Sequence, residues 1–172
     1  MERISEFKKV TAERFREDFL SVFTDKTAAE ADAAYNSIKL PARATRGSAG
    51  YDFFSTADIE LKPGETVKIP TGIRAEMREG WVLMIFPRSS LGFKYKLMLN
   101  NTVGIIDSDY FYSDNEGHIF IKIINDNNEG KTVNIEKGTA FAQGIFLPFG
   151  ITEDDCAEGE RNGGFGSTDK AR

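Results

Sequence analysis

Residues 65–87 read ETVKIPTGIRAEMREGWVLMIFP, a series of short apolar runs separated by turns that contain glycine or proline. Runs of this length with such breaks are typical of β-strands joined by tight turns. The same pattern continues from residue 38 to about residue 150, in GYDFFSTADIEL, YKLMLNNTVGII, GHIFIKIIND, KTVNIEKG and TAFAQGIFLPF. Because no helical periodicity interrupts these runs, we predict an all-β sandwich or barrel.

Residues 1–37 have a different pattern, which predicts two helices. Phenylalanines recur every fourth residue from Phe15 to Phe23 after Thr11, the spacing of one apolar helix face with Thr11 as N-cap. A second helix would begin at Thr27, where a glutamate three residues later has the spacing of a capping box. We therefore expect a helical N-terminal extension. Its phenylalanines either pack on the main domain, the interpretation that we favour, or bind a protein partner.

Composition and charge argue against several classes of function. The net charge is −5, and no dense Lys/Arg run is present, which argues against nucleic acid as a partner. With His118 and Cys156 as the single histidine and cysteine, a His/Cys zinc site and an intramolecular disulfide are disfavoured. His118 is expected to be an ordinary strand residue. No apolar stretch approaches the roughly 18 residues of a membrane span, and the N-terminus is too charged for a signal peptide. We therefore expect a cytoplasmic protein with no membrane partner.

Five segments carry polar residues that a plain β-domain does not require. GSAGYDFFS places Asp52 beside a glycine turn, and PRSSLG places Arg88 and two hydroxyls after an apolar strand, where they suit a phosphate cradle. NNTVGIIDSDY places Asp107 and Tyr110 after an apolar run that could form one arm of a hairpin. GTAFAQGIF offers Gln143 in an apolar strand, where a polar amide needs a partner. The fifth segment, GERNGGFGSTDKAR, combines glycines with one phenylalanine and adjacent hydroxyls.

Together and in this order, the five segments resemble the motifs of the trimeric dUTP diphosphatase (dUTPase) family. AGYD, PRSSLG, GIIDSDY, AFAQ and GGFGST follow one another between Gly47 and Asp169, nearly as the family writes them. One such motif alone would be weak, whereas five in order are specific. The resemblance implies a distorted jelly-roll β-barrel and a homotrimer with active sites shared between subunits. It also implies hydrolysis of dUTP to dUMP and pyrophosphate with Mg²⁺, which would limit uracil in DNA and supply dUMP for dTMP synthesis.

The resemblance also implies roles for residues of this sequence. Asp107 looks like the base that activates the attacking water, and Asp52 and Gln143 would support the polar network around it. The residues that would contact uracil and deoxyribose are Asn101, Gly104, Ile106, Tyr110 and Phe165. The residues that would contact the phosphates are Arg88, Ser89, Ser90, Gln143, Arg161, Gly166, Ser167 and Thr168. Mg²⁺ would be held mainly by the triphosphate of the substrate, with no direct protein ligand.

Three positions depart from the family pattern. Ala140 stands where the fourth motif often carries an arginine, and Arg161 lies four residues before Phe165 where five are common. After Tyr110 the chain continues as FYSDNEGH, which is longer than the short turn of many members. The resemblance says little about residues 1–37.

Two alternatives remain beside this interpretation. A dCTP deaminase of the same fold superfamily would carry a glutamate where Lys122 stands, and a lysine cannot act as that acid/base carboxylate. A nucleotide-sensing regulatory protein would use the N-terminal helices for docking, and loss of Asp107 or of the tail would have supported it. We expect three parts: a helical extension over 1–37, a dUTPase-like β-barrel core over 38–150, and, over 151–172, an acidic linker with a glycine-rich arm that closes on bound nucleotide as a lid.

Overall fold

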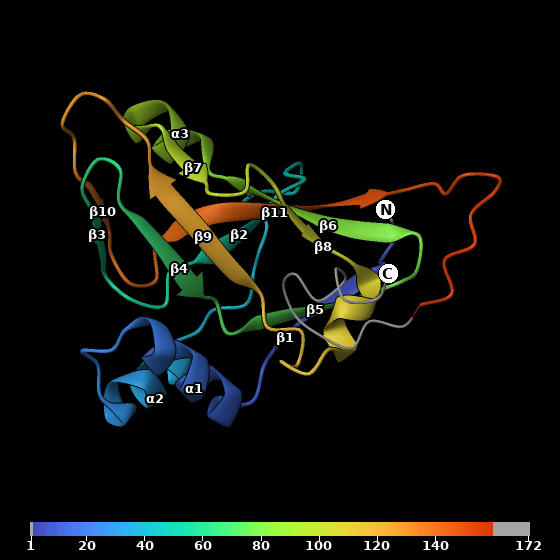
Figure 1. The fold of residues 1–172 in the computed structure, drawn as a ribbon, viewed down its shortest axis with the longest axis horizontal. Coiled ribbons are helices and arrows are strands. Elements are labelled where there is room, and N and C mark those ends of the chain that lie inside the picture. Colours follow the sequence, from blue (N-terminus) through green and yellow to red (C-terminus); the bar gives the residue numbers. More distant parts are fainter. Residues whose placement is uncertain (1, 160–172) are drawn as a thin grey trace.

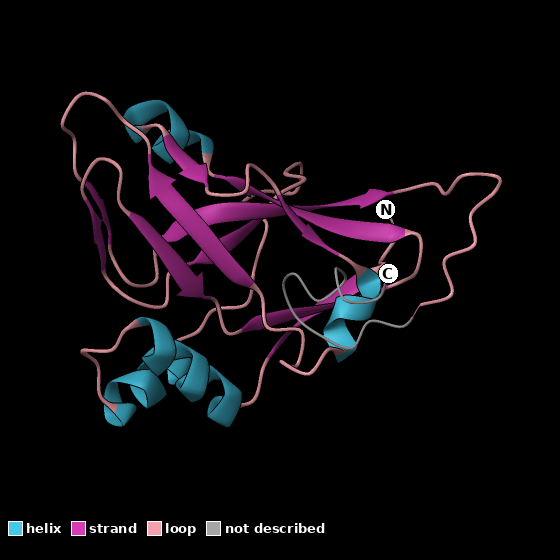
Figure 2. Cartoon of the chain, viewed as in Figure 1, coloured by secondary structure: helices cyan, strands magenta, loops and turns pink. Residues whose placement is uncertain are grey.

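The computed structural model describes residues 2–159, and its main elements are short strands (Figures 1 and 2). The strands are β1 (Ser5–Lys9), β2 (Tyr51–Phe54), β3 (Ile59–Leu61), β4 (Thr66–Pro70), β5 (Ile73–Met77), β6 (Trp81–Pro87), β7 (Leu97–Leu99), β8 (Gly104–Ile106), β9 (Phe120–Asn125), β10 (Val133–Ile135) and β11 (Ala140–Pro148). The helices are α1 (Ala12–Val22), α2 (Ala28–Asn36), α3 (Ser89–Tyr95) and the 3₁₀-helix η1 (Ser108–Tyr112). The prediction of a mainly β domain after residue 38 is confirmed. The domain is not uninterrupted β-structure, however, because α3 and η1 lie between its strands. The sequence did not predict these helices, since both are too short to show a helical periodicity.

Within residues 2–159 the strands pair antiparallel in four separate sheets. The largest has the order β2-β11-β6-β8, and a three-stranded sheet has the order β4-β9-β7. The pairs β1-β5 and β10-β3 complete the set. Strand β11 runs through the middle of the molecule (Figure 1). The ladders of the described residues do not join into one ring, so the closed barrel expected from the sequence is not seen as a continuous sheet.

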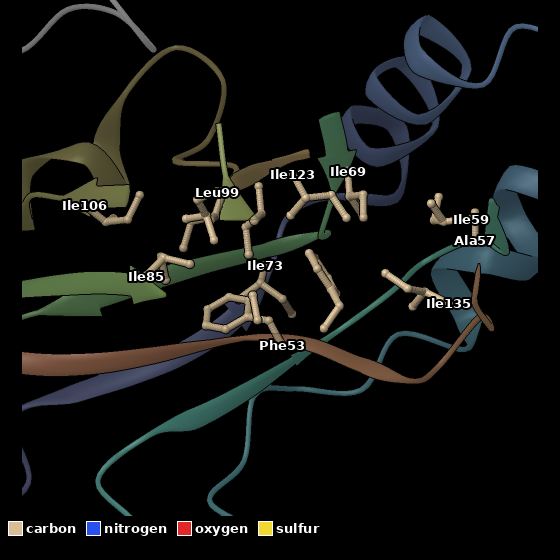
Figure 3. Packing of buried hydrophobic residues seen from close by; sticks show 14 of the residues in the cluster. Phe53, Ala57, Ile59, Ile69, Ile73, Ile85, Leu99, Ile106, Ile123 and Ile135 are labelled. Atoms are coloured by element: carbon tan, nitrogen blue, oxygen red, sulfur yellow. The ribbon is translucent and has the colours of Figure 1, made fainter. Parts of the chain in front are cut away.

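The apolar faces of the sheets meet in one core. Along β9 the side chains alternate, so that Ile121 and Ile123 are buried and Lys122 between them is exposed. Figure 3 shows side chains from different sheets gathering in the interior, among them Ile85 of β6 and Leu99 of β7. Burying each such side chain contributes about 1.5–3 kcal/mol, which is the main stabilisation available to strands this short.

The N-terminal segment belongs to this core. Strand β1 pairs with β5 along its whole length, helix α1 packs against β4, and helix α2 packs against α1 (Figure 1). Phe15 and Phe19 of α1 are 0% and 2% exposed and are members of the core cluster. The favoured interpretation, that these phenylalanines pack on the main domain, is confirmed. The expected extension is not purely helical, because the segment opens with strand β1, which pairs with β5.

The helix starts lie where the sequence predicts them. The Thr11 side chain accepts a hydrogen bond from the backbone of Arg14, and Thr27 and Glu30 form a complete capping box. In the part of the chain that the structure describes, no helix combines the length and apolarity needed to cross a membrane.

Candidate active site

A cavity of about 200 Å³ lies where β7 and β8 diverge. The sequence indicates that the apolar run before Asp107 could form one arm of a hairpin. In the structure this run, β8, pairs with β6, whereas β7 pairs with β9. The residues between them cross from one sheet to the other, and the cavity opens at that crossing. The residues around it come from five strands and the β7–β8 connection: Lys68, Ile85, Leu99, Asn100, Asn101, Gly104, Ile106, Phe120, Ile121 and Lys122.

The walls of this cavity are apolar and its polar groups are few, as in most small-molecule sites. Asn101, Gly104 and Ile106, which the sequence predicts to contact a nucleotide base, all line it. Lys68 and Lys122 face each other across the β4–β9 pair, and the Lys68 ammonium lies 4.0 Å from the centre of the Phe120 ring. Sequence reasoning did not single out either lysine for this cavity, although each is an exposed position in an alternating strand.

Asp107 directly follows Ile106 and precedes η1, and Tyr110 lies within η1. Asp107 is half-buried at the start of η1, whereas Tyr110 is only 3% exposed. The Tyr110 hydroxyl donates to the carbonyl of His118 at 2.7 Å and accepts from Asn115 Nδ2 at 2.8 Å. Neither Asp107 nor Tyr110 lines the cavity, but both lie within four residues of Ile106, which does.

A second cluster joins three of the predicted polar residues. Gln143 of β11 lies directly opposite Asp52 of β2, and β11 also pairs with β6, which ends beside Arg88. Arg88 Nε lies 3.4 Å from Asp52 Oδ1, and Gln143 Nε2 donates to the carbonyl of Pro87 at 3.4 Å. A Cβ atom at Gly50 would lie 2.6 Å from Gln143 Oε1, so only glycine permits this close approach. Segments far apart in the sequence are thereby brought together by neighbouring strands.

The two predicted hydroxyls extend this cluster. Ser89 and Ser90 are exposed in the first turn of α3, next to Arg88. The Arg88 backbone N–H donates to the carbonyl of Phe141 at 3.3 Å, which holds the start of α3 against β11. A guanidinium beside hydroxyl groups can hold an anion such as phosphate.

Asp107 and the Arg88 cluster lie at opposite ends of β6. In the β6–β8 pair Ile106 is opposite Leu83, which places Asp107 level with the start of β6. Arg88 lies just beyond the other end of that strand. At about 3.3 Å per residue, the two positions are roughly 20 Å apart along the strand direction.

The sequence pattern that defines the dUTPase family matches residues 36–169, which is most of the chain. The chain belongs to the dUTPase family. The match begins at the end of α2, so β1 and α1 lie outside the part that the family shares.

Individual relatives agree with this membership. The deoxyuridine 5'-triphosphate nucleotidohydrolase of Lactococcus lactis subsp. lactis is 46% identical over 134 residues, covering 76% of this chain and 88% of the relative. The protein of the same name from Hahella chejuensis is 40% identical over 141 residues, covering 77% and 88%. The crystal structure of dUTPase from Streptococcus mutans has a TM-score of 0.63 at 36% identity, covering 86% of this chain and 98% of that one. The relatives are enzymes, and so is this dUTPase-family chain.

Five of the residues that the dUTPase motifs single out lie outside the described residues. They are Arg161, Phe165, Gly166, Ser167 and Thr168.

His118, expected to be an ordinary strand residue, has a more specific place in this dUTPase-family fold. It precedes β9 by two residues and is fully buried, and its Nδ1 lies 2.6 Å from Asp18 Oδ2 on α1. Its Nε2 accepts a hydrogen bond from the Gly72 backbone N–H at 2.8 Å, so the ring is neutral and Nδ1 carries the proton. Burial lowers the pKa of His118 more strongly than the Asp18 carboxylate raises it. No local pattern could have revealed this pair, because its members are 100 positions apart.

Proposed function

We propose that this protein hydrolyses dUTP to dUMP and pyrophosphate in the cytoplasm. Family membership supports the reaction class. The observation that supports the substrate is the cavity between β7 and β8, whose lining residue Ile106 is directly followed by Asp107. Uracil presents acceptor, donor and acceptor groups along one edge. Backbone groups around Asn101 and Gly104 can match that order, whereas cytosine would set a donor against a donor. Each buried polar group left unpaired costs about 1–3 kcal/mol, which gives real discrimination.

Asp107 would act as the general base. A half-buried carboxylate that directly follows the cavity-lining Ile106 can accept a proton from water that attacks the α-phosphorus in line with departing pyrophosphate. Most of the rate would come from positioning, since the reacting atoms must be held about 3–3.5 Å apart. Tyr110 would form a rigid floor beneath the deoxyribose, and a ribose hydroxyl at C2′ would then clash with its ring.

Arg88 with Ser89, Ser90 and Gln143 would hold the phosphates. The carboxylate of Asp52 lies beside the guanidinium and would orient it. Residues Arg161, Gly166, Ser167 and Thr168 of the C-terminal motif would add phosphate contacts, with Phe165 stacked on uracil. The glycine-rich segment would thereby complete the site only with nucleotide bound, which excludes water at the moment of reaction.

Magnesium would be held mainly by the triphosphate. Within residues 2–159 no group of three or more His, Cys, Asp or Glu side chains is arranged to hold a metal ion. Mg²⁺ usually keeps several waters and binds through substrate phosphates, and this chemistry is the basis of the proposal. When bound, the ion neutralises charge on the triphosphate. A phage phi11 dUTPase of S. aureus coordinates a structural Mg(II) ion, but at 20% identity it supports the fold alone.

A homotrimer would bring the separated parts of the site together. The roughly 20 Å between Asp107 and Arg88 along β6 exceeds the reach of one triphosphate group, so one chain's Arg88 cluster cannot serve its own Asp107. Two copies related by rotation would place the Asp107 of one beside the phosphate cluster of another. The sheets would then form the distorted jelly-roll barrels of such a trimer.

The test is a pyrophosphate-release assay on dUTP, dTTP, dCTP and UTP with Mg²⁺, on the wild-type protein and on Asp107→Asn. We expect efficient turnover of dUTP alone. The substitution should lower kcat by roughly 10²–10⁴-fold and leave dUTP binding largely intact. Equal turnover of dTTP, or an active Asp107→Asn protein, would contradict the assignment.

The deaminase alternative is disfavoured by the same cavity. Deamination of dCTP needs an acid/base carboxylate near the amino group, and Lys122, which lines the cavity, stands where the related deaminases carry that glutamate. Ammonia release from dCTP would revive it.

A further inference from the structure

The turn that links η1 to β9 is fastened to helix α1 at two points. The Glu116 carboxylate accepts hydrogen bonds from the Thr11 backbone N–H at 2.8 Å and from the Thr11 hydroxyl at 2.7 Å. Two helical turns further along α1, Asp18 receives the hydrogen bond of His118. The turn is therefore held at Thr11 and Asp18 on a helix whose Phe15 and Phe19 belong to the core cluster.

The contact between Asp18 and His118 is an interior one. The His118 ring is fully buried against Phe15 and Phe120, and the Asp18 side chain is only 18% exposed. Because Nε2 already accepts from Gly72, the Nδ1 proton depends on Asp18 as its acceptor. A buried N–H that loses its acceptor is costly, so without Asp18 the ring and the turn that carries it would have to shift.

The other side of the same turn holds Tyr110. The His118 carbonyl accepts the Tyr110 hydroxyl, Asn115 donates to that hydroxyl, and the Ser113 hydroxyl donates to the Tyr110 carbonyl at 2.7 Å. At Gly117 the backbone has φ +68°, and a Cβ there would lie 2.7 Å from the Phe111 Cα. The turn is thus packed directly onto the backbone of η1, which begins immediately after Asp107.

We infer that Asp18 is a positioning residue for the active site: through His118 it fixes Tyr110 and the adjoining Asp107. Residues of α1 lie outside the part of the chain that matches the family, yet one of them holds the segment that carries the base and the floor of the sugar site. For its catalytic consequence this inference rests on the proposed function. The N-terminal segment is then a component of the catalytic unit rather than a docking element that could be removed.

The experiment compares full-length Asp18→Ala and Asp18→Asn with a matched control, Asp32→Ala. Asp32 lies on α2 and accepts two hydrogen bonds of 2.8 Å from Arg16 of α1; within residues 2–159 it makes no hydrogen bond or ion pair to the turn. The control therefore removes one carboxylate from the same helix pair without touching His118. Two measurements are made at a temperature below the unfolding transition of each variant. They are the kcat and KM for dUTP, and the rate of amide hydrogen exchange over residues 107–118.

We expect Asp18→Ala to lower kcat by roughly 10- to 100-fold with little change in KM, because small displacements of positioned groups cost this much. Asp18→Asn keeps an acceptor oxygen of the same shape and should recover most of the rate. Exchange over residues 107–118 should accelerate in Asp18→Ala and stay at the wild-type rate in Asp32→Ala.

Two results would overturn the inference: a kcat for Asp18→Ala equal to that of Asp32→Ala, or unchanged exchange over residues 107–118. If Asp18→Ala does not fold, Glu116→Ala takes its place, since it breaks the outer attachment to Thr11. Glu116→Ala should also lower kcat and accelerate exchange, by smaller factors than Asp18→Ala. An unchanged kcat or an unchanged exchange rate would equally contradict the inference. A wild-type protein inactive on dUTP would refute the proposed function alone, because the exchange experiment still decides whether Asp18 orders the turn.

Discussion

Asp52 and Gln143 stand directly opposite each other across the antiparallel pair of β2 and β11. Arg88 directly follows the neighbouring strand β6, and its Nε lies 3.4 Å from Oδ1 of the same Asp52 carboxylate. Three polar groups from distant parts of the sequence are thus held on adjacent strands, which are more rigid supports than loops. The first two predictions concern this cluster.

Replacing Gly50 by alanine should impair catalysis more than stability. The new Cβ would lie 2.6 Å from Gln143 Oε1, so the half-buried amide must move away from its present place. Gly47→Ala is the matched control, because nothing lies within 4 Å of a Cβ at that position. We expect kcat/KM for dUTP to fall by roughly tenfold in Gly50→Ala, as for a modest displacement of a positioned group, and to stay unchanged in Gly47→Ala. Equal activity of the two variants would show that Gln143 has no part in the site.

Removing the guanidinium in Arg88→Ala should lower kcat/KM for dUTP by roughly 10²–10³-fold, the usual effect of losing one donor to developing charge. Arg88→Lys should recover only part of this, because an ammonium lacks the planar fork of donors. Arg78→Ala serves as control, since Arg78 is exposed beyond β5 and pairs with Glu2 at the surface. Steady-state kinetics on the three variants decide the matter, and a fully active Arg88→Ala would remove Arg88 from the phosphate site.

How much of the fold and of the candidate site could be predicted depends on how far apart in the sequence the interacting residues lie. The strand runs were predictable because alternation such as that of Ile121, Lys122 and Ile123 is a local property. The Asp52–Arg88–Gln143 cluster was predictable as a set only through the family motifs, and its geometry needed the β2-β11-β6 order. The divergence of β7 from β8 and the His118–Asp18 pair were not predictable, because each depends on tertiary contacts that leave no local pattern.

The N-terminal segment should be essential for folding. Phe15 is fully buried and packs against Phe19 and Tyr35, so Phe15→Ala should lower the free energy of unfolding by about 3–5 kcal/mol. Phe23→Ala, at the half-buried end of the same helix, should cost clearly less. Deleting residues 1–37 should leave little folded protein, because it also strips β1 from β5. Urea unfolding measures the two substitutions, and a soluble, folded deletion would contradict the integration of this segment.

Stability should fall as the solution is acidified below about pH 6.5, the ordinary pKa of histidine. Because burial lowers the pKa of His118 in the folded state, the unfolded chain binds more protons between that lowered pKa and about 6.5. The stabilisation by the neutral ring is therefore complete above pH 6.5 and is lost as the pH falls through the folded-state pKa. The lowered pKa of Glu116 acts in the same direction, in the range below its ordinary value of 4.5.

Urea unfolding at a series of pH values checks this, with His118→Gln as the comparison. The variant should be less stable at pH 7.5 yet lose less stability between pH 6.5 and pH 5, since it lacks the titrating ring. Parallel curves for the two proteins over that interval would show that His118 does not titrate as described.

Deleting residues 161–172 should separate catalysis from folding. Within residues 2–159 the buried core cluster lies between Val10 and Ala142. We expect the unfolding midpoint of the shortened protein to change little. If Arg161, Ser167 and Thr168 contact the phosphates as the family motif implies, kcat/KM for dUTP should fall by roughly 10²-fold or more, because several donors are lost together. Deleting only residues 170–172, which follow the motif, is the control and should leave turnover intact. A 161–172 deletion that keeps full activity would assign the whole site to residues before 161, and the C-terminal motif would then have to serve some purpose other than catalysis.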